Sequence, residues 1–285
     1  MVRDSFAVFI LSHGRANKVD TVETLKNGGY TGKWYFLLDD EDTQIDDYKR
    51  IYGENHIIIF NKQKALQYFD IMDNFDGNKV ITFARNALNK IAYDMGLEYF
   101  WELEDDYERF DFRIEVGDHL PIIHVRNLDE VIEAFLDYLD YSNIKTIAFA
   151  QTGEMLGGIN GAVWKDQIRR KAMNTFFFKT SNPLTFLGRF NDDVNAYITF
   201  GKLGDVILQT AIVSLTQRVT QQNSGGIAES YKSFGTYVKS FYSVMLRPDC
   251  VKIDVMGKSD RRIHHNISWE YCVPKIISDK FKIKD

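Results

Sequence analysis

Hydrophobic residues along the chain alternate between short apolar runs and stretches with helical spacing. The apolar runs predict strands at 6–11, 34–38, 56–60, 99–103, 146–150, 175–179 and 206–216. Apolar residues that recur about every 3.6 positions predict helices over 19–25, 82–95, 128–139 and 194–198. Strands that alternate with helices are typical of βαβ units and a largely parallel sheet. We therefore expect an α/β fold.

Two of the predicted helices carry recognisable ends. Thr82 is a candidate N-cap of the second helix and Gly96 its stop, and Asn127 is placed to cap 128–139. The polar stretch 217–243 has no clear period and predicts a mobile loop or lid. No internal repeat, low-complexity tract or linker interrupts the sequence. We expect one compact unit with an elaborated C-terminal third.

The composition is that of an ordinary folded protein. Of 285 residues, 45% are hydrophobic and 26% charged, which excludes collagen-like and disordered chains. Cys250 and Cys272 are too few for a disulfide scaffold or a cysteine-built zinc module. The sequence lacks a signal-peptide pattern and a window of about 18 apolar residues, so we expect a cytoplasmic protein without a membrane span. The net charge of −5 does not favour nucleic acid, but a local basic patch suffices for binding it.

Three consecutive carboxylates, Glu104, Asp105 and Asp106, directly follow the predicted strand at 99–103. In open α/β sheets, ligands bind at the edge formed by the carboxyl ends of the strands. Neighbouring carboxylates repel each other, and a hard cation such as Mn²⁺ or Mg²⁺ relieves that repulsion. The triplet therefore predicts a metal site that holds a diphosphate. The alternative is a solvated acidic turn.

A second acidic pair, Asp192 and Asp193, precedes a predicted helix. Acidic residues at this position interact favourably with the helix dipole and can cap the helix. The functional interpretation makes Asp193 a general base that removes a proton from an attacking hydroxyl.

Two adjacent histidines, His264 and His265, lie far along the chain from the acidic triplet. Neighbouring side chains of an extended segment face opposite ways, so one of them, by preference His265, could supply an imidazole to the same metal. The alternative is an ordinary surface or core position. Arg85, one turn into the helix at 82–95, and Arg15, after the first strand, are suited to a phosphate or a nucleobase carbonyl. Both could equally be solvated.

Several well-known motifs are missing. The sequence has no GxxxxGK[ST] loop and no strand-linked GxGxxG, which weighs against P-loop and dinucleotide-binding proteins. Neither GxSxG nor HExxH occurs.

Taken in order, the motifs resemble a nucleotide-sugar glycosyltransferase of the GT-A type. The resemblance runs through the segments 9–15, 37–40, 83–87, 104–106 and 191–194 and ends with the late histidines. Within that class, Glu-Leu-Glu-Asp-Asp-Tyr at 102–107 and Arg-Ile-His-His-Asn-Ile-Ser-Trp at 262–269, followed by Pro274, are most similar to the TET-associated glycosyltransferases. These phage-type enzymes glycosylate 5-hydroxymethylpyrimidines in DNA. The triplet departs from a strict DxD at Glu104, which leaves open whether Glu104 or Asp105 joins Asp106 at the metal.

The resemblance implies a GT-A-like single Rossmann-like domain over 1–285, with a nucleotide-binding half at 1–110 and an acceptor-binding half at 111–285. It also implies roles for the candidate residues. Mn²⁺ or Mg²⁺ would be bound by Asp106 with His265, with Glu104 and His264 as the other candidates. The nucleotide of a UDP-sugar would be positioned by Arg15, Asp39, Arg85 and Asp105. Asp193, next to Asp192, would deprotonate the acceptor hydroxymethyl group and favour inversion at the anomeric carbon.

A DNA acceptor also needs phosphate contacts and a way to enclose the base. Two basic clusters offer contacts: Lys165, Arg169, Arg170 and Lys171, then Lys258, Arg261 and Arg262. The stretch 217–242 could close over an extruded base. Three rivals remain: a GT-A enzyme acting on a glycan or small molecule, a metal-dependent phosphohydrolase or nuclease, and a non-enzymatic binding module.

Overall fold

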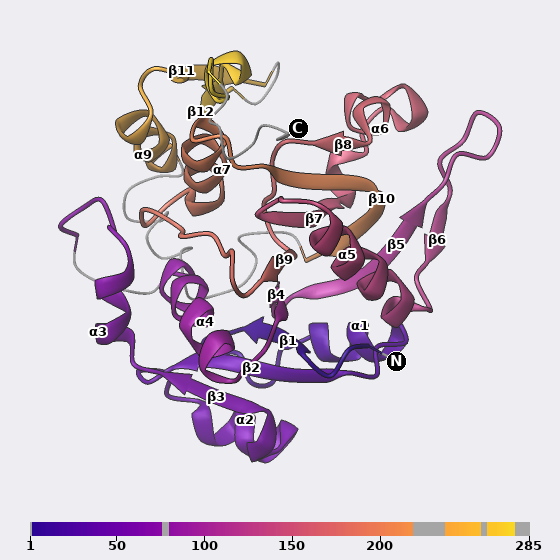
Figure 1. The fold of residues 1–285 in the computed structure, drawn as a ribbon, viewed down its shortest axis with the longest axis vertical. Coiled ribbons are helices and arrows are strands. Elements are labelled where there is room, and N and C mark those ends of the chain that lie inside the picture. Colours follow the sequence, from indigo (N-terminus) through magenta and orange to yellow (C-terminus); the bar gives the residue numbers. More distant parts are fainter. Residues whose placement is uncertain (1, 76–79, 219–236, 258–260, 277–285) are drawn as a thin grey trace, which may run out of the picture.

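One large mixed sheet forms the centre of the molecule (Figure 1). The computed structural model describes residues 2–75, 80–218, 237–257 and 261–276. Within them, the sheet has the strand order β3-β2-β1-β4-β9-β7-β10-β5-β6, with β8 beside β10. Its strands are β1 (Phe6–Leu11), β2 (Lys33–Asp39), β3 (Ile57–Phe60), β4 (Tyr99–Glu104), β5 (Tyr107–Arg113), β6 (Ile122–His124), β7 (Thr146–Gln151), β8 (Ile168–Arg169), β9 (Phe176–Lys179) and β10 (Ile207–Gln217).

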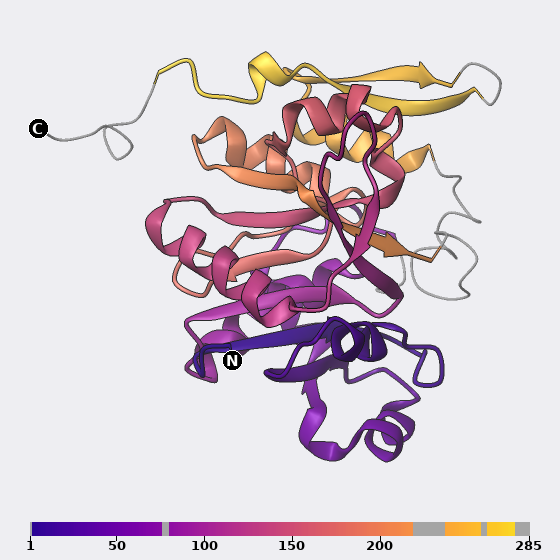
Figure 2. The same cartoon turned by 90° about the vertical axis from the view of Figure 1, so that its right-hand side faces the viewer.

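Helices cover this sheet, and a separate hairpin lies at the C-terminal end of the fold (Figures 1 and 2). The hairpin consists of β11 (Val251–Met256) and β12 (Arg262–Ile267). The α-helices are α1 (Thr21–Asn27), α2 (Ile45–Tyr52), α3 (Lys62–Ala65), α4 (Thr82–Asp94), α5 (Leu128–Tyr141), α6 (Ala162–Asp166), α7 (Asp192–Lys202) and α9 (Val238–Leu246). The short 3-10 helices are η1 (Glu54–His56), η2 (Leu66–Tyr68), η3 (Thr152–Glu154), η4 (Gly158–Asn160) and η5 (Trp269–Tyr271). In the described residues, no helix is both long and apolar enough to cross a membrane.

Most strands of the sheet point the same way. The pairs β3–β2, β2–β1, β1–β4 and β7–β10 are parallel. Strand β9 runs antiparallel between β4 and β7, and β5 and β8 run antiparallel to β10. The predicted mixed α/β fold with a mostly parallel sheet is therefore confirmed.

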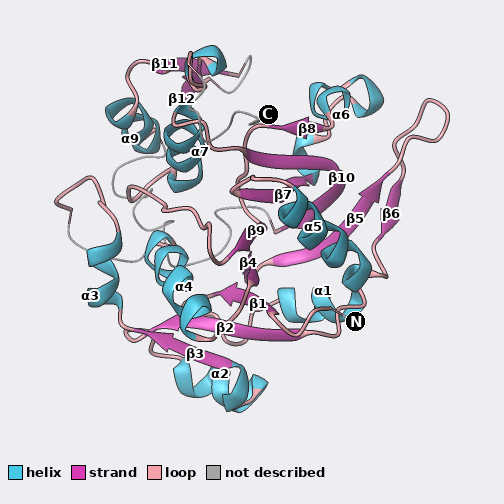
Figure 3. Ribbon diagram, viewed as in Figure 1, coloured by secondary structure: helices cyan, strands magenta, loops and turns pink. Residues whose placement is uncertain are grey.

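Strand β1 is buried over its whole length because both faces of the sheet are covered (Figure 3). Phe6, Val8 and Ile10 belong to one core cluster, which includes residues of α1 and α5. Ala7 and Phe9 belong to the other, which includes residues of α4 and α7. This division follows from the two-residue period of a strand, and it explains the uninterrupted apolar run in the sequence.

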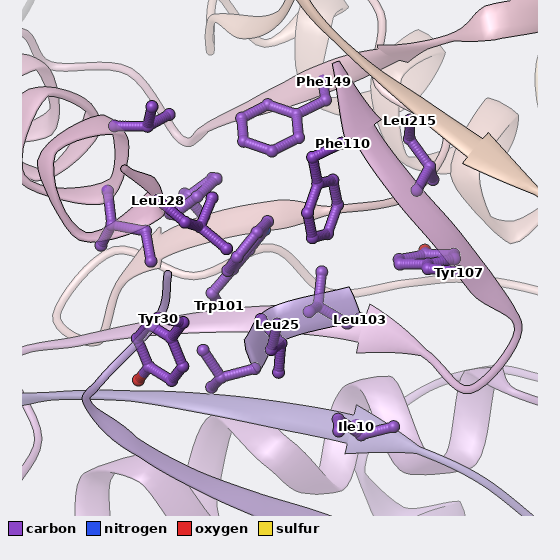
Figure 4. Close-up of a cluster of buried hydrophobic side chains, with 14 of the residues drawn as sticks. Ile10, Leu25, Tyr30, Trp101, Leu103, Tyr107, Phe110, Leu128, Phe149 and Leu215 are labelled. Carbon is purple, nitrogen blue, oxygen red and sulfur yellow. The ribbon is translucent and has the colours of Figure 1, made fainter. Parts of the chain in front are cut away.

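Several aromatic rings pack against one another in the first core cluster (Figure 4). Trp101 stacks on Phe177 with ring centroids 4.5 Å apart, and it also contacts Phe110 and Phe149 at 5.4 and 5.3 Å. Such aromatic pairs contribute about 0.5–1.5 kcal/mol each beyond the area they bury. Since Trp101 lies in β4, this packing fixes the strand that ends at Glu104.

The predicted strands and helices agree with the structure to within a few residues, but two predictions need correction. Thr82 is the first residue of α4 instead of its cap, and its hydroxyl donates to the carbonyl of Gly188 at 3.0 Å. The predicted loop at 217–243 is wrong at both described ends: Gln217 closes β10, and α9 begins at Val238. Residues 219–236, on which the rest of that prediction falls, lie outside the described residues. Several elements were not predicted: β5, β6, β8, β11, β12, α2, α3 and α6. Of these, β5 begins directly after the acidic triplet.

Candidate active site

A cavity of about 430 Å³ opens at the carboxyl edge of the sheet. There the parallel strands β1, β2 and β4 end together, facing the N-terminal ends of α4, α7 and α9. Helix N-termini carry partial positive charge, which suits an anionic ligand. Seven of the predicted site residues line this cavity: Arg15, Asp39, Arg85, Glu104, Asp105, Asp192 and Asp193.

Arg85 joins the two acidic motifs. Its Nη2 lies 3.1 Å from Oε1 of Glu104, and its Nη1 lies 3.0 Å from Oδ2 of Asp192. Its Nε lies 2.9 Å from Oε1 of Glu102, a residue that sequence reasoning missed. Arg85 is 3% exposed, and its guanidinium contacts these three carboxylates. Its main role is therefore to hold the acids in place, and few of its N–H groups remain for a nucleotide.

The acids around Arg85 outnumber the cations. Burial raises the pKa of Glu102 to about 7, against the opposing effect of Arg85. Burial also raises the pKa of Glu104, and the neighbouring charge of Asp106 adds to that rise. Three acids share one arginine, and their burial favours the protonated forms of Glu102 and Glu104. A bound cation would instead favour the ionised forms.

Glu104 and Asp106 converge on a single point. The amide Nε2 of Gln217, at the end of β10, donates to Oε2 of Glu104 at 3.2 Å and to Oδ1 of Asp106 at 2.9 Å. Asp105 faces elsewhere: it lies 3.0 Å from Nη1 of Arg15 and accepts a hydrogen bond from Ser12. Asp105 and Asp106 form the turn between β4 and β5, and this turn directs their side chains to different partners. Of the two arrangements left open by the sequence, the structure pairs Glu104 with Asp106.

Two converging carboxylates fit a hard divalent cation. Mg²⁺ is commonly bound by one or two carboxylates together with substrate phosphates, and seldom by a cage made of protein alone. The described part of the chain holds no group of three or more His, Cys, Asp or Glu side chains placed to bind a metal. The predicted set of Asp106, Glu104, His264 and His265 is therefore not gathered into one group.

His265 lies beside the N-cap of α7, and its strand β12 packs against α9. Nδ1 of His265 lies 3.1 Å from Nδ2 of Asn191, which also donates to the carbonyl of Lys239 at 3.0 Å. With the amide nitrogen as donor, Nδ1 of His265 accepts the hydrogen bond, which corresponds to the tautomer that carries its proton on Nε2. Burial lowers the pKa of His265 to about 4, so the ring is neutral. A metal-binding role for His264 or His265 finds no support among the described residues.

Asp192 and Asp193 begin α7 and have different surroundings. Asp192 is 8% exposed and is bound by Arg85. Asp193 faces the cavity, as does Lys239. Burial raises the pKa of Asp193 to about 6, and the charge of Asp192 contributes to that rise. A carboxylate with a raised pKa in a cleft is a candidate general base.

A third group of charges lies at the end of β2. Nδ1 of His13 is 2.6 Å from Oδ2 of Asp39, and Nζ of Lys62 is 3.3 Å from Oδ1 of the same residue. Although burial opposes it, the hydrogen bond with His13 lowers the pKa of Asp39. The sequence identified Asp39 but missed His13 and Lys62. For His13 a signal was available, because it follows the first strand immediately.

The predicted basic clusters are partly engaged within the protein. Lys171 pairs with Glu154, and Arg169 lies 3.0 Å from Asp166. Arg262 is exposed on β12. Lys258 falls outside the described residues.

A family model described as TET-Associated Glycosyltransferase matches residues 6–226, which include both acidic motifs and Gln217. This match defines the class of the protein as a glycosyltransferase. The chain belongs to the TET-associated glycosyltransferase family. A sequence search of curated proteins gives no match.

Solved structures give only distant likenesses. TarS 1–349 of S. aureus is 10% identical, with a TM-score of 0.46, and the alignment covers 86% of this chain but 65% of TarS. A putative nucleotide-diphospho-sugar transferase from Desulfovibrio desulfuricans G20 is 11% identical at a TM-score of 0.41, covering 86% and 97% of the two chains. Glucosyl-3-phosphoglycerate synthase from Mycobacterium tuberculosis is 10% identical at a TM-score of 0.45, and the alignment covers 90% of this chain and 86% of the synthase. We draw no functional conclusion from likeness at this level.

Proposed function

We propose that this protein transfers a sugar from a nucleotide-sugar donor, a UDP-sugar, to 5-hydroxymethylcytosine or a related hydroxymethylpyrimidine in DNA. The observation that carries the proposal is the buried Arg85, which holds Glu104 and Asp192 at one cleft. Glu104, one member of the carboxylate pair suited to a cation, and the candidate base Asp193 thereby line the same cavity. The family of the chain supports the reaction class.

On the donor side, the proposal assigns the diphosphate to the acidic turn. Glu104 and Asp106 would hold Mn²⁺ or Mg²⁺, which when bound neutralises charge on the departing nucleoside diphosphate. Arg15 lines the same wall, and its guanidinium contact with Asp105 leaves further N–H groups for a phosphate. Asp39, fixed by His13 and Lys62, would position the nucleoside. The nucleotide-binding half at 1–110 contains all of these residues.

On the acceptor side, Asp193 would take the proton of the hydroxymethyl group. The freed oxygen then forms a bond to the anomeric carbon as the bond from that carbon to the diphosphate breaks. Attack from the face opposite the leaving group gives inversion. Asp192 positions this base through its contact with Arg85. The raised pKa of Asp193 matches the requirement for a base that works near neutral pH.

The direct test is transfer itself. The protein is incubated with Mn²⁺, a panel of UDP-sugars and a DNA duplex that contains 5-hydroxymethylcytosine, and the digested nucleosides are weighed by mass spectrometry. We expect one nucleoside heavier by a single sugar, absent when the duplex contains cytosine instead. Transfer to a glycan or small molecule alone would overturn the DNA acceptor. Cleaved DNA or free phosphate without any donor would point to a hydrolase.

Thermal melting tests the donor site separately. Mn²⁺ and UDP together should raise the melting temperature by several degrees, and each alone by much less, because the diphosphate completes the coordination of the cation. If the two together shift melting no more than either alone, the shared metal and diphosphate site is wrong.

A further inference from the structure

A second cavity, of about 520 Å³, lies beside α7 and shares no lining residue with the first. Its walls come from the segment around β8, from α7 and from η5. The residues that give it chemical character are Arg169, Arg170, Tyr197 and Trp269. Nothing in the proposed transfer reaction uses them.

An aromatic platform forms one wall of this cavity. The rings of Trp269 and Tyr197 stack with centroids 5.5 Å apart and planes inclined by 22°. Tyr197 is 6% exposed, whereas Trp269 is 44% exposed. The indole therefore covers the tyrosine with one face and leaves surface open to a ligand. An open indole face is a stacking surface for a planar ring such as a nucleobase.

Two arginines stand at the same cavity. Nε of Arg169 donates to Oδ2 of Asp166 at 3.0 Å, and Nη2 of Arg170 donates to the carbonyl of Asp205 at 3.2 Å. Each guanidinium has five N–H donors, so these contacts orient the groups and leave donors for an anion. Asp166 and Asp205 also line the cavity, so the site suits a single phosphate better than a highly charged ligand. Lys171 is already paired with Glu154.

The position of the platform is fixed by close packing on α7. A Cβ atom added to Gly201 would lie 2.9 Å from the carbonyl oxygen of Cys272, so only glycine allows the segment that follows Trp269 to approach the helix this closely. Tyr197 lies four residues after Asp193 on the same helix. Residues with this spacing share a helix face and are separated by one turn, roughly 6 Å along the axis. The platform is thus one turn from the proposed base.

We propose that the second cavity binds one nucleotide unit of the acceptor strand, a neighbour of the unit that is glycosylated. Its base stacks on Trp269, and its phosphate contacts Arg169 and Arg170. This assignment rests on the proposed DNA acceptor and names the part of the acceptor that this face recognises. A free mononucleotide offers the same base and phosphate chemistry, so the test separates the two sources.

The test measures binding of a fluorescently labelled 12-nucleotide DNA with one 5-hydroxymethylcytosine, by anisotropy and without a donor. We expect Trp269→Ala to weaken binding at least tenfold and Trp269→Phe to restore most of it. The matched control is Tyr271→Ala, because Tyr271 lies on the same 3-10 helix, is 44% exposed and does not line the cavity. Replacing Arg169 and Arg170 by Gln should make the plot of log affinity against log salt concentration less steep, by the amount expected for the loss of about one or two phosphate contacts.

Unchanged binding by Trp269→Ala, or equal weakening by Tyr271→Ala, would overturn the assignment. The assignment would also be overturned if a free nucleoside monophosphate displaced the labelled DNA at the same concentration as unlabelled oligonucleotide. The ligand of the cavity would then be a mononucleotide. If Trp269→Ala fails to fold, the arginine variants decide the question: an unchanged salt dependence of binding would overturn the assignment. Binding is measured separately from catalysis. If DNA binding depends on Trp269 but no sugar is transferred, the proposed function is refuted while the binding site for the nucleotide unit stands. In kinetics, the KM for DNA should rise in the variants while the KM for the donor stays constant.

Discussion

Nη1 of Arg85 lies 3.0 Å from Oδ2 of Asp192, and this ion pair ties the start of α4 to the start of α7. Through Nη2 the same guanidinium reaches Glu104 at the end of β4. The two acidic motifs are far apart in the sequence, yet one buried side chain sets their separation. The geometry of the cleft therefore depends on a residue that neither motif contains.

Arg85→Ala should be strongly destabilising. The substitution leaves three carboxylates buried without their cation, and breaking a buried ion pair from one side costs about 3–5 kcal/mol. Urea unfolding monitored by circular dichroism measures the loss. The matched control is Lys90→Ala on the same helix, where the exposed pair with Asp94 is screened by water and should contribute little to stability. Equal effects of the two variants would contradict the central position of Arg85.

Glu102 should make stability depend on pH. Its pKa in the folded protein is about 7, above the ordinary value, so the folded state keeps a proton that the unfolded state has released. Stability should then fall as pH rises from about 4.5 to 7, by at most about 3 kcal/mol for this group. Glu102→Gln removes this slope, whereas Glu98→Gln, an exposed position just before β4, should leave it. Urea unfolding at pH 5, 6, 7 and 8 compares the three proteins.

Asp193 should control the acid limb of the pH–rate profile. A base must be deprotonated, so transfer should be lost as pH falls through about 6, well above the pKa of an ordinary aspartate. Asp192→Asn removes a neighbouring negative charge and should move this limb to lower pH. Asp193→Asn should abolish transfer while the melting shift with Mn²⁺ and UDP persists. An Asp193→Asn protein with wild-type turnover would refute the assignment of the base.

The paired carboxylates should be needed for the donor but not for folding. Glu104→Gln and Asp106→Asn each remove one charge from the point where both meet Gln217. We expect both variants to lose the melting shift that Mn²⁺ and UDP produce together, and to lose transfer. Asp106→Ala should likewise be inactive and folded. An active Asp106→Ala enzyme would remove the metal site from this turn.

A variant of His265 distinguishes a positioning role of this histidine from a metal-binding role. Its contact with Asn191 places it beside the start of α7, so His265→Ala should lower kcat by about tenfold through the position of Asp193. The Mn²⁺ concentration for half-maximal activity should stay the same. Titration of activity with Mn²⁺ measures both quantities. A rise of tenfold or more in the required Mn²⁺ would make the histidine a metal ligand after all.

The sequence predicts well the strands that carry this site. Apolar runs followed directly by polar residues located β1, β2 and β4, and the parallel arrangement of these strands brings their carboxyl ends together. The turns that carry Arg15, Asp39 and the triplet at 104–106 consequently meet at one edge. These features depend on local pattern alone, which a single sequence contains.

The partners across the site were not predictable. Glu102, Lys62 and Gln217 meet the predicted residues only after strands and helices from distant segments pack together, and periodicity reveals the face of an element, not what lies opposite. Strand β9 illustrates this, because its antiparallel insertion between β4 and β7 depends on long-range pairing. The surroundings of the histidines at 264 and 265 were not predictable for the same reason, because they depend on the packing of α9 against the terminal hairpin.

The amide of Gln217 has a consequence for how the acidic turn is loaded. Its Nε2 already stands where Glu104 and Asp106 converge, and the next residue, Arg218, donates its backbone N–H to the carbonyl of Asp106 at 3.1 Å. A cation bound as proposed would therefore have to displace a side chain of the protein itself. Gln217 would then compete with the metal, and the turn would exchange its amide for a cation only where the gain in free energy exceeds that of two hydrogen bonds.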